Sequence, residues 1–205
     1  MDRRDFFTRG LRKVTTEVVK EVDAKAVQRA QQWLRPPFAI GELEFLLACT
    51  RCDACIDACT YQVVFPLPAR LGVSVVNTPA LDLLNKGCHL CSDWPCVMAC
   101  ETGALKLPDI SVDNEDQAHG SGVILPILAV ATVDTQLCLP YQGPECGGCR
   151  DICMVNGAMS WYMEKPQIHA EHCTGCALCR ESCIVEPKAI TIKSVYKQQD
   201  ADQIV

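Results

Sequence analysis

Sixteen cysteines constrain this chain of 205 residues more than any other feature of its sequence. They form four groups of four, which long stretches without cysteine separate. Every group ends in Cys-x3-Cys, and the first and fourth groups have the full spacing Cys-x2-Cys-x2-Cys-x3-Cys. The second group contains one gap of four residues, and the third begins with a gap of seven. In chain order the groups are Cys49, Cys52, Cys55 and Cys59; Cys88, Cys91, Cys96 and Cys100; Cys138, Cys146, Cys149 and Cys153; and Cys173, Cys176, Cys179 and Cys183.

This spacing is the bacterial ferredoxin run, which binds 4Fe–4S clusters. Three cysteines that are two residues apart wrap one cluster in a tight loop, and the loop's backbone N–H groups hydrogen-bond to the cluster sulfides. The fourth cysteine starts a helical turn, points away from the loop and binds the second cluster of two-cluster ferredoxins. Sixteen thiolates suffice for four 4Fe–4S clusters with none left over. All sixteen cysteines are therefore predicted iron ligands.

Disulfides and zinc are the alternative uses of these cysteines. Repeated two-residue gaps are poor geometry for disulfide bridges, and the chain shows no cleavable export signal. Zinc also binds Cys-x2-Cys pairs, but zinc ribbons place two such pairs well apart, whereas the ligands here crowd within a few residues. The sequence favours iron–sulfur clusters over both.

Similar segments surround the cysteine groups and indicate internal duplication. Residues 101–107, 154–161 and 184–192 each have a bend of small residues that ends in alanine, followed by a short alternating strand. Strands over 128–133 and 167–169 lead into the third and fourth groups. The predicted fold class is α+β: duplicated bacterial-ferredoxin-like units, each a β-cluster loop-α-β segment templated by its cluster, over residues 36–205.

The segment 1–35 differs from the cysteine-rich body, because it carries a net charge of +4 and the rest of the chain carries −10. Apolar residues recur every three or four positions from Phe7 to Ala30, which predicts an amphipathic N-terminal helix. Glu21 and Lys25 form a favourable pair one turn apart, and Pro36 ends the helix. The apolar stripe either covers the chain's own core or docks on a partner, and both interpretations stay open. The acidic total excludes a generally basic nucleic-acid binder.

The first residues resemble a degenerate twin-arginine export motif, Asp-Arg-Arg-Asp-Phe-Phe over 2–7. Charged residues interrupt the apolar stretch that such a signal requires. The longest apolar run, 123–133, contains Pro126 and is too short to cross a bilayer. We therefore expect no transmembrane span and a cytoplasmic location, including the periphery of a membrane complex, and a periplasmic one only after export together with a partner.

Four segments of the chain resemble the NapG/MauM-type ferredoxins: 34–37 with 47–55, 88–105, 138–143 and 173–176. The NapF-type ferredoxins have a similar opening and third group. The resemblance extends from residue 34 to about residue 195, and the unusual gaps of the second and third groups make it specific. It implies a four-cluster electron carrier that serves a quinol dehydrogenase in a periplasmic nitrate or methylamine pathway.

Two function classes follow. The first is an electron-transfer subunit that passes single electrons between a donor, such as a membrane quinol dehydrogenase, and a partner such as a molybdenum oxidoreductase. The second, suggested by the NapF-type relatives, is a maturation factor for a redox enzyme. The sequence has no GxGxxG, P-loop or HExxH motif, and His89, His119, His169 and His172 are isolated. We therefore expect no catalysis by this chain alone.

The closing Cys-x3-Cys indicates that groups exchange their fourth cysteine in pairs, rather than each holding its own cluster. Either neighbouring groups pair, or the outer groups pair around the inner ones. The unmodified spacing of groups one and four favours the nested arrangement. This arrangement resembles the four-cluster subunits of molybdenum oxidoreductases, which use the same nesting. The outer pair is then 49–59 with 173–183, and the inner pair is 88–100 with 138–153. Cys49, Cys52 and Cys55 would share a cluster with Cys183, and Cys138, Cys146 and Cys149 with Cys100. Likewise, Cys173, Cys176 and Cys179 would join Cys59, and Cys88, Cys91 and Cys96 would join Cys153.

Overall fold

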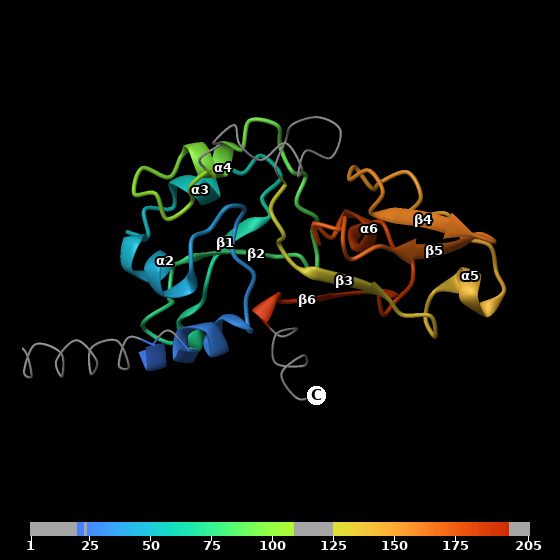
Figure 1. Cartoon of the computed structure of the whole chain (residues 1–205), viewed down its shortest axis with the longest axis horizontal. Coiled ribbons are helices and arrows are strands. Elements are labelled where there is room, and N and C mark those ends of the chain that lie inside the picture. Colours follow the sequence, from blue (N-terminus) through green and yellow to red (C-terminus); the bar gives the residue numbers. More distant parts are fainter. Residues whose placement is uncertain (1–19, 23, 109–124, 197–205) are drawn as a thin grey trace, which may run out of the picture.

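The computed structural model describes residues 20–22, 24–108 and 125–196. Short helices and strands form two halves that lie side by side, the N-terminal half over residues 38–107 and the C-terminal half over 128–193 (Figure 1). Long loops that carry the cysteines, rather than long helices or wide sheets, make up most of each half. The elements are α2 (Glu42–Ala48), α3 (Ala54–Asp57), β1 (Val64–Pro66), η1 (Ala69–Leu71), β2 (Pro79–Leu81), α4 (Pro95–Met98), β3 (Val130–Val133), α5 (Leu139–Gln142), β4 (Met159–Tyr162), β5 (Lys165–Ile168), α6 (Leu178–Glu181) and β6 (Ile190–Lys193).

In the C-terminal half an antiparallel pair encloses the other elements. β3 precedes the third cysteine group and pairs with β6, which follows the fourth, with Val130 opposite Lys193. Between them β4 and β5 form a second antiparallel pair that separates the two groups. Both cysteine groups of this half therefore lie between β3 and β6 in the chain.

The N-terminal half has the same order of elements. Ala39 forms an antiparallel bridge with Leu105, and the N–H of Ile40 donates to the oxygen of Ala104 at 3.1 Å. This pair encloses the first two cysteine groups, as β3 and β6 enclose the last two. β1 and β2 pair between the groups, with Val64 opposite Leu81.

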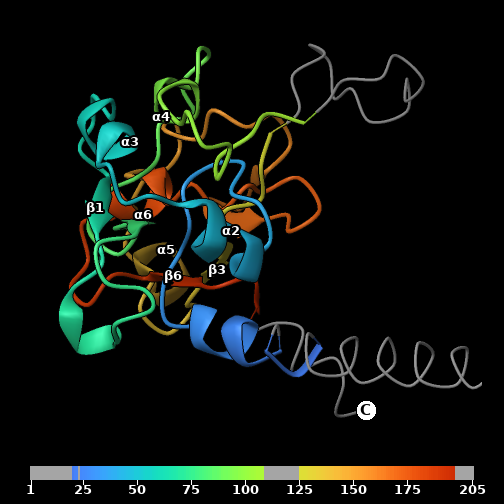
Figure 2. The ribbon, with the colours of Figure 1, turned by 90° about the vertical axis from the view of Figure 1, so that its left-hand side faces the viewer.

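The end of the N-terminal segment packs against the N-terminal half. Residues 20–22 and 24–30 are helical, and both Figure 1 and Figure 2 place them at the opposite edge of the molecule from α4. Glu21 and Lys25 form the predicted ion pair, with 2.8 Å between Oε1 and Nζ. Ala30 and Trp33 are buried against the segment between β1 and β2, whereas Val22 is 46 % exposed. The described part of the apolar stripe thus covers the chain's own core only at its C-terminal end. Residues 1–19 of the predicted helix lie outside the described residues.

A buried ion pair fixes the chain after this helix. The Arg35 guanidinium binds Glu42 in α2, with 2.6 Å between Nη2 and Oε1, and both side chains are almost fully buried. Arg35 also donates to the hydroxyl of Thr78 and to the oxygen of Pro79, at 2.9 and 2.8 Å. Because this one cation joins the entry segment, α2 and the start of β2, it holds the first cysteine loop against the body of its half.

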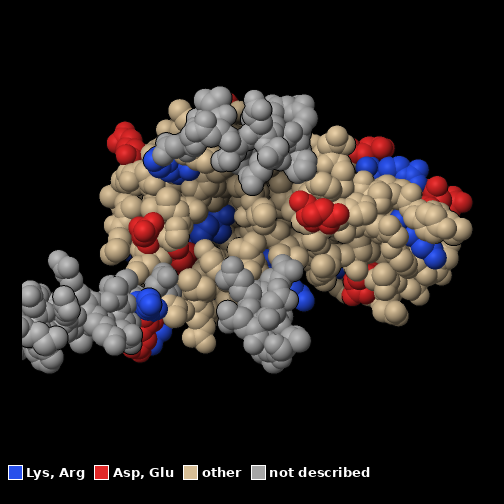
Figure 3. All heavy atoms as spheres, in the orientation of Figure 1, with Lys and Arg blue, Asp and Glu red and all other residues tan. Residues whose placement is uncertain are grey.

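The fold agrees in part with the prediction. Helices and strands are both present and short, as an α+β fold requires. The expected strands over 128–133, after Cys153 and after Cys183 correspond to β3, β4 and β6, but residues 101–107 contribute only the bridge at Leu105. In the described part of the chain, no helix is long and apolar enough to cross a membrane. Acidic and basic side chains are interspersed on the face seen in Figure 3.

Candidate iron–sulfur centres

All sixteen cysteines lie within the described residues, and none forms a disulfide bond. Their thiols gather into four sets, which we name after one member each. The Cys55 set lines a hollow with a volume of about 340 Å³ between the first cysteine loop and the end of the second group. Its members are Cys49, Cys52, Cys55 and Cys100. Three thiols come from group one and the fourth from group two, which is the exchange expected of a Cys-x3-Cys closure.

The Cys96 set is the reciprocal of the first. It lines a hollow of about 390 Å³, together with Pro37 and Tyr61. Its members are Cys59, Cys88, Cys91 and Cys96. The two sets are adjacent, because Cys55 and Cys96 lie in one buried cluster.

The C-terminal half repeats this exchange. The Cys179 set lines a hollow of about 350 Å³ and consists of Cys153, Cys173, Cys176 and Cys179. The remaining thiols form the Cys149 set, which consists of Cys138, Cys146, Cys149 and Cys183. The first, second and fourth of these lie close enough to Cys149 to raise its pKa. The two sets are neighbours, since Cys149 and Cys179 lie in one buried cluster.

The nested pairing of 49–59 with 173–183, and of 88–100 with 138–153, is therefore wrong. Neighbouring groups exchange their fourth cysteines: Cys100 completes the Cys55 set, and Cys183 completes the Cys149 set. The strand pairing explains this. β3 with β6, and Ala39 with Leu105, each close around two consecutive groups, so that a group can reach only the neighbour inside the same enclosure.

Left-handed backbone conformations shape three of the four loops in the same way. The residue just before the second cysteine has a positive φ: 59° at Arg51, 47° at Leu90 and 69° at Gly175. The residue two positions before the third cysteine does as well, at Asp53, Trp94 and Ala177, and each of these three precedes a short helix. Such turns expose successive N–H groups on the inner side of a loop, where they can donate to sulfur.

Backbone N–H groups inside one loop, and after the fourth cysteine of two groups, reach thiols. The N–H of Leu105 lies 3.3 Å from Sγ of Cys100, and that of Val63 lies 3.4 Å from Sγ of Cys59. The N–H of Gly175 lies 3.4 Å from Sγ of Cys173. Glycine is required at 175, because a Cβ there would come within 2.0 Å of the oxygen of Ala129. Backbone donors therefore lie within reach of thiol sulfur in three of the cysteine groups.

Burial and mutual repulsion raise the pKa of the Cys55 and Cys149 thiols. Burial, followed by repulsion from Cys49, Cys100 and Cys52, raises the pKa of Cys55 to about 12. Burial, followed by repulsion from Cys138, Cys183 and Cys146, raises the pKa of Cys149 to about 11. Thiols that crowd around one hollow can ionise together only beside positive charge, and iron supplies that charge. The donor chemistry of the sets fits a 4Fe–4S cluster.

Cys100 is an exception within this pattern. Burial raises its pKa, but hydrogen bonds from the N–H of Leu105 and the hydroxyl of Thr102 outweigh burial, and the pKa lies below its ordinary value. The hydrogen bonds stabilise the thiolate form, which is the form that binds iron.

Two of the described histidines contact other side chains. His89 stacks on Tyr61 with 3.5 Å between the ring centroids, and His169 hydrogen-bonds to the hydroxyl of Ser160 at 2.7 Å. His119 lies outside the described residues. Within the described ranges, no three His, Cys, Asp or Glu side chains are placed to hold a single metal ion.

Sequence comparison finds relatives over most of the chain. The methylamine utilization ferredoxin-type protein MauM of Methylobacillus flagellatus is 30 % identical over 205 aligned positions, which cover 93 % of this chain and 83 % of that protein. The ferredoxin-type protein NapG of Haemophilus influenzae is 33 % identical over 78 % of this chain, which spans 58 % of the length of that protein. The ferredoxin-type protein NapF of Escherichia coli is 28 % identical over 82 % of this chain and 90 % of its own length.

No family model matches the chain. No solved structure matches it either. The NapG protein of Escherichia coli is 32 % identical over 78 % of this chain and 69 % of its own length, in agreement with the MauM relative. The chain belongs to the MauM and NapG family of ferredoxin-type proteins.

Proposed function

We propose that this protein is an iron–sulfur electron-transfer protein that carries four 4Fe–4S clusters and passes single electrons between a donor and a partner oxidoreductase. The observation that carries the proposal is the gathering of sixteen thiols into four sets of four, three of them around hollows of similar volume. The membership of the chain among ferredoxin-type proteins supports the same conclusion.

The duplicated architecture is part of this proposal. Each half consists of an enclosing strand pair, two cysteine loops and a strand pair between the loops, which is the arrangement of one two-cluster ferredoxin unit. Residues 36–205 then form two such units in tandem, after an N-terminal segment over 1–35.

The side chains have separate roles toward the clusters. A bound 4Fe–4S cluster supplies a carrier of one electron at a time. The four thiolates of each set hold the iron, and N–H donors such as that of Leu105 stabilise negative charge on sulfur. Buried apolar residues such as Phe45 and Val97 exclude water around the Cys55 set, which together with these hydrogen bonds sets the reduction potential.

The partners proposed are redox proteins, with a membrane quinol dehydrogenase as the donor and a molybdenum oxidoreductase as the acceptor. We place the protein in the cytoplasm or at the cytoplasmic face of a membrane complex. The exposed start of the described helix, around Val22, is available for docking on such a complex. A reporter fused to the N-terminus tests the location, since activity found only in the periplasm contradicts it.

A maturation factor for a redox enzyme is the second candidate, and the 28 % identity to NapF over 82 % of this chain favours it. Copurification from the native cell separates the two functions. An electron-transfer subunit remains in a stoichiometric complex with its oxidoreductase, whereas a maturation factor leaves the mature enzyme.

A reductive titration of anaerobically purified protein tests the proposal directly. Stepwise addition of a low-potential reductant should place about four electrons on each chain, because each 4Fe–4S cluster accepts one. Uptake of no electrons, or stoichiometric zinc in place of iron, would contradict the four-cluster assignment.

A further inference from the structure

The two halves meet at the segments that carry the Cys96 set and the Cys179 set. The N–H of Cys88 donates to the oxygen of Cys176 at 2.7 Å, so that one peptide hydrogen bond connects a member of each set. The side chain of Cys88 also packs against the buried cluster that contains Cys176. We propose that this contact is the bridge by which an electron passes between the halves, and that Gly87 is the positioning residue that permits it. The inference rests on the proposed electron-transfer function.

Glycine at position 87 allows the backbones to come this close. A Cβ on Gly87 would lie 2.6 Å from Cδ2 of Leu178 and 2.7 Å from its Cα and N atoms. Two of these three atoms belong to the backbone, so a rotamer change at Leu178 cannot relieve the overlap. Any side chain at 87 must therefore push the Cys88 loop away from α6.

Polar contacts on both sides hold the bridge in place. The N–H of Gly87 donates to Oε2 of Glu181 at 2.7 Å. Nε of Arg180 donates to the oxygen of Leu84 at 2.9 Å. Glu181 and Arg180 belong to α6 of the C-terminal half, and their backbone partners belong to the loop that leads into Cys88. Together with the hydrogen bond between Cys88 and Cys176, three hydrogen bonds within a few residues stabilise the contact.

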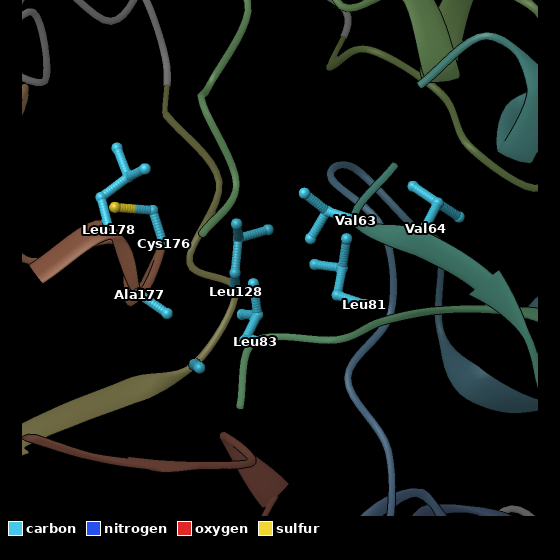
Figure 4. Packing of buried hydrophobic residues seen from close by; sticks show 9 residues of the cluster. Val63, Val64, Leu81, Leu83, Leu128, Cys176, Ala177 and Leu178 are labelled. Carbon is cyan, nitrogen blue, oxygen red and sulfur yellow. The ribbon is translucent and has the colours of Figure 1, made fainter. Parts of the chain in front are cut away.

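Apolar side chains surround the bridge. Cys176 and Leu178 lie in one buried cluster with Val63, Leu83 and Leu128, drawn from both halves (Figure 4). Figure 4 shows Leu83 and Leu128 between Leu178, at the start of α6, on one side and Val63 on the other. A dry and closely packed junction keeps the two thiol sets at a fixed separation.

Shared buried clusters give the order of the four sets. Cys55 and Cys96 lie in one cluster, so the Cys55 set adjoins the Cys96 set. The bridge joins the Cys96 set to the Cys179 set, and Cys149 and Cys179 lie in another cluster, so the Cys179 set adjoins the Cys149 set. When one electron crosses the bridge, the cluster that donates it is oxidised by one electron and the cluster that accepts it is reduced by one electron. The two end sets then exchange electrons with partners, and Cys52 of the Cys55 set is the exposed cysteine of the sixteen.

The substitution Gly87→Ala tests the bridge. We expect the variant to retain the iron content of the natural protein and to lose the EPR broadening that arises between the two sets facing each other at the junction. Gly41→Ala is the matched control, because the nearest atom to a Cβ there is Oε2 of Glu44 at 4.0 Å and the backbone φ is −49°. Unchanged broadening in Gly87→Ala with full iron content would overturn the inference.

A second pair of variants adds no atoms to the junction. These variants test the bridge even if Gly87→Ala loses iron. Glu181→Ala removes the acceptor of the Gly87 N–H, and Glu181→Gln retains an oxygen at that place. We expect hydrogen exchange of the peptide around Cys88 to rise about tenfold in Glu181→Ala, with loss of the EPR broadening, and to return toward the natural rate in Glu181→Gln.

Natural exchange and natural broadening in Glu181→Ala would overturn the inference. The same experiment separates this failure from that of the proposed function. If the natural protein contains no iron, the proposed function itself is contradicted. If the natural protein has four intact clusters but the variants keep its EPR broadening and hydrogen exchange, only the bridge is contradicted.

Discussion

Cys100 shares its hollow with Cys55, although the two residues belong to different cysteine groups. The N–H of Leu105 donates to Sγ of Cys100 at 3.3 Å, and Leu105 itself forms the bridge to Ala39. The strand contact that closes the N-terminal half thus also positions a cluster ligand. Loss of that contact would release Cys100 from the Cys55 set.

The hydrogen bond from Thr102 to Cys100 should tune the cluster of the Cys55 set. The Thr102 hydroxyl lies 3.7 Å from Sγ of Cys100. Hydrogen bonds to sulfur stabilise the more negative, reduced cluster, so Thr102→Val should lower its reduction potential. Thr102→Ser retains the hydroxyl and serves as the control. An EPR-monitored redox titration in which both variants keep the natural potential would refute this role.

The buried Arg35–Glu42 pair should matter more to stability than the exposed Glu21–Lys25 pair. Arg35→Ala leaves the Glu42 carboxylate buried without its cation, which costs about 3–5 kcal/mol. Lys25→Ala breaks a pair whose side chains are both 69 % exposed, and it should cost less than about 0.5 kcal/mol. Denaturant unfolding under anaerobic conditions measures both, and equal effects would contradict the role of the buried pair.

Gly175 should tolerate alanine less well than Gly103. Both have a positive φ, 69° and 71°, which costs alanine about 1–2 kcal/mol. At Gly103 a Cβ meets nothing within 4 Å, whereas at Gly175 it would lie 2.0 Å from the oxygen of Ala129. Gly103→Ala should therefore lose only the strain energy, and Gly175→Ala should also displace β3 and lose iron faster on heating. Similar rates of iron loss would show that the loop is not packed against Ala129.

Iron retention should increase with pH between about pH 6 and 9. Burial comes first, and thiolate neighbours second, in raising the pKa of both Cys55 and Cys96 to about 12. The thiols therefore take up protons when iron leaves and release them when iron binds, so that protons compete with iron throughout this range. Extraction by a chelator should be fastest at the acidic end. A rate independent of pH would mean that the freed thiols stay ionised.

The cysteine spacing predicted much of this molecule. Cys-x2-Cys and Cys-x3-Cys are local patterns, so the loops and the exchange of fourth cysteines follow from the chain itself. The short helices after Asp53, Trp94 and Ala177 end before the fourth cysteine, where the helical turn was predicted to start. The strands β3 and β6 were also predicted from local alternation.

The partner of each group was not predicted, because it depends on long-range pairing. β1 and β2 lie in a segment without a strong alternating pattern, and their role in separating two groups of one half was not foreseen. The bridge between Ala39 and Leu105 leaves only an isolated contact, which no sequence period reveals. Regular spacing in groups one and four therefore indicated common descent of the loops, not proximity.

Counting intact four-iron clusters in two double variants tests the account most directly. Cys55→Ala with Cys100→Ala removes two ligands of one set, and Mössbauer spectra should show three intact clusters. Cys55→Ala with Cys183→Ala removes one ligand from each of two sets and should leave two. The opposite result, with two intact clusters in the first variant and three in the second, would restore the nested pairing and contradict the structure.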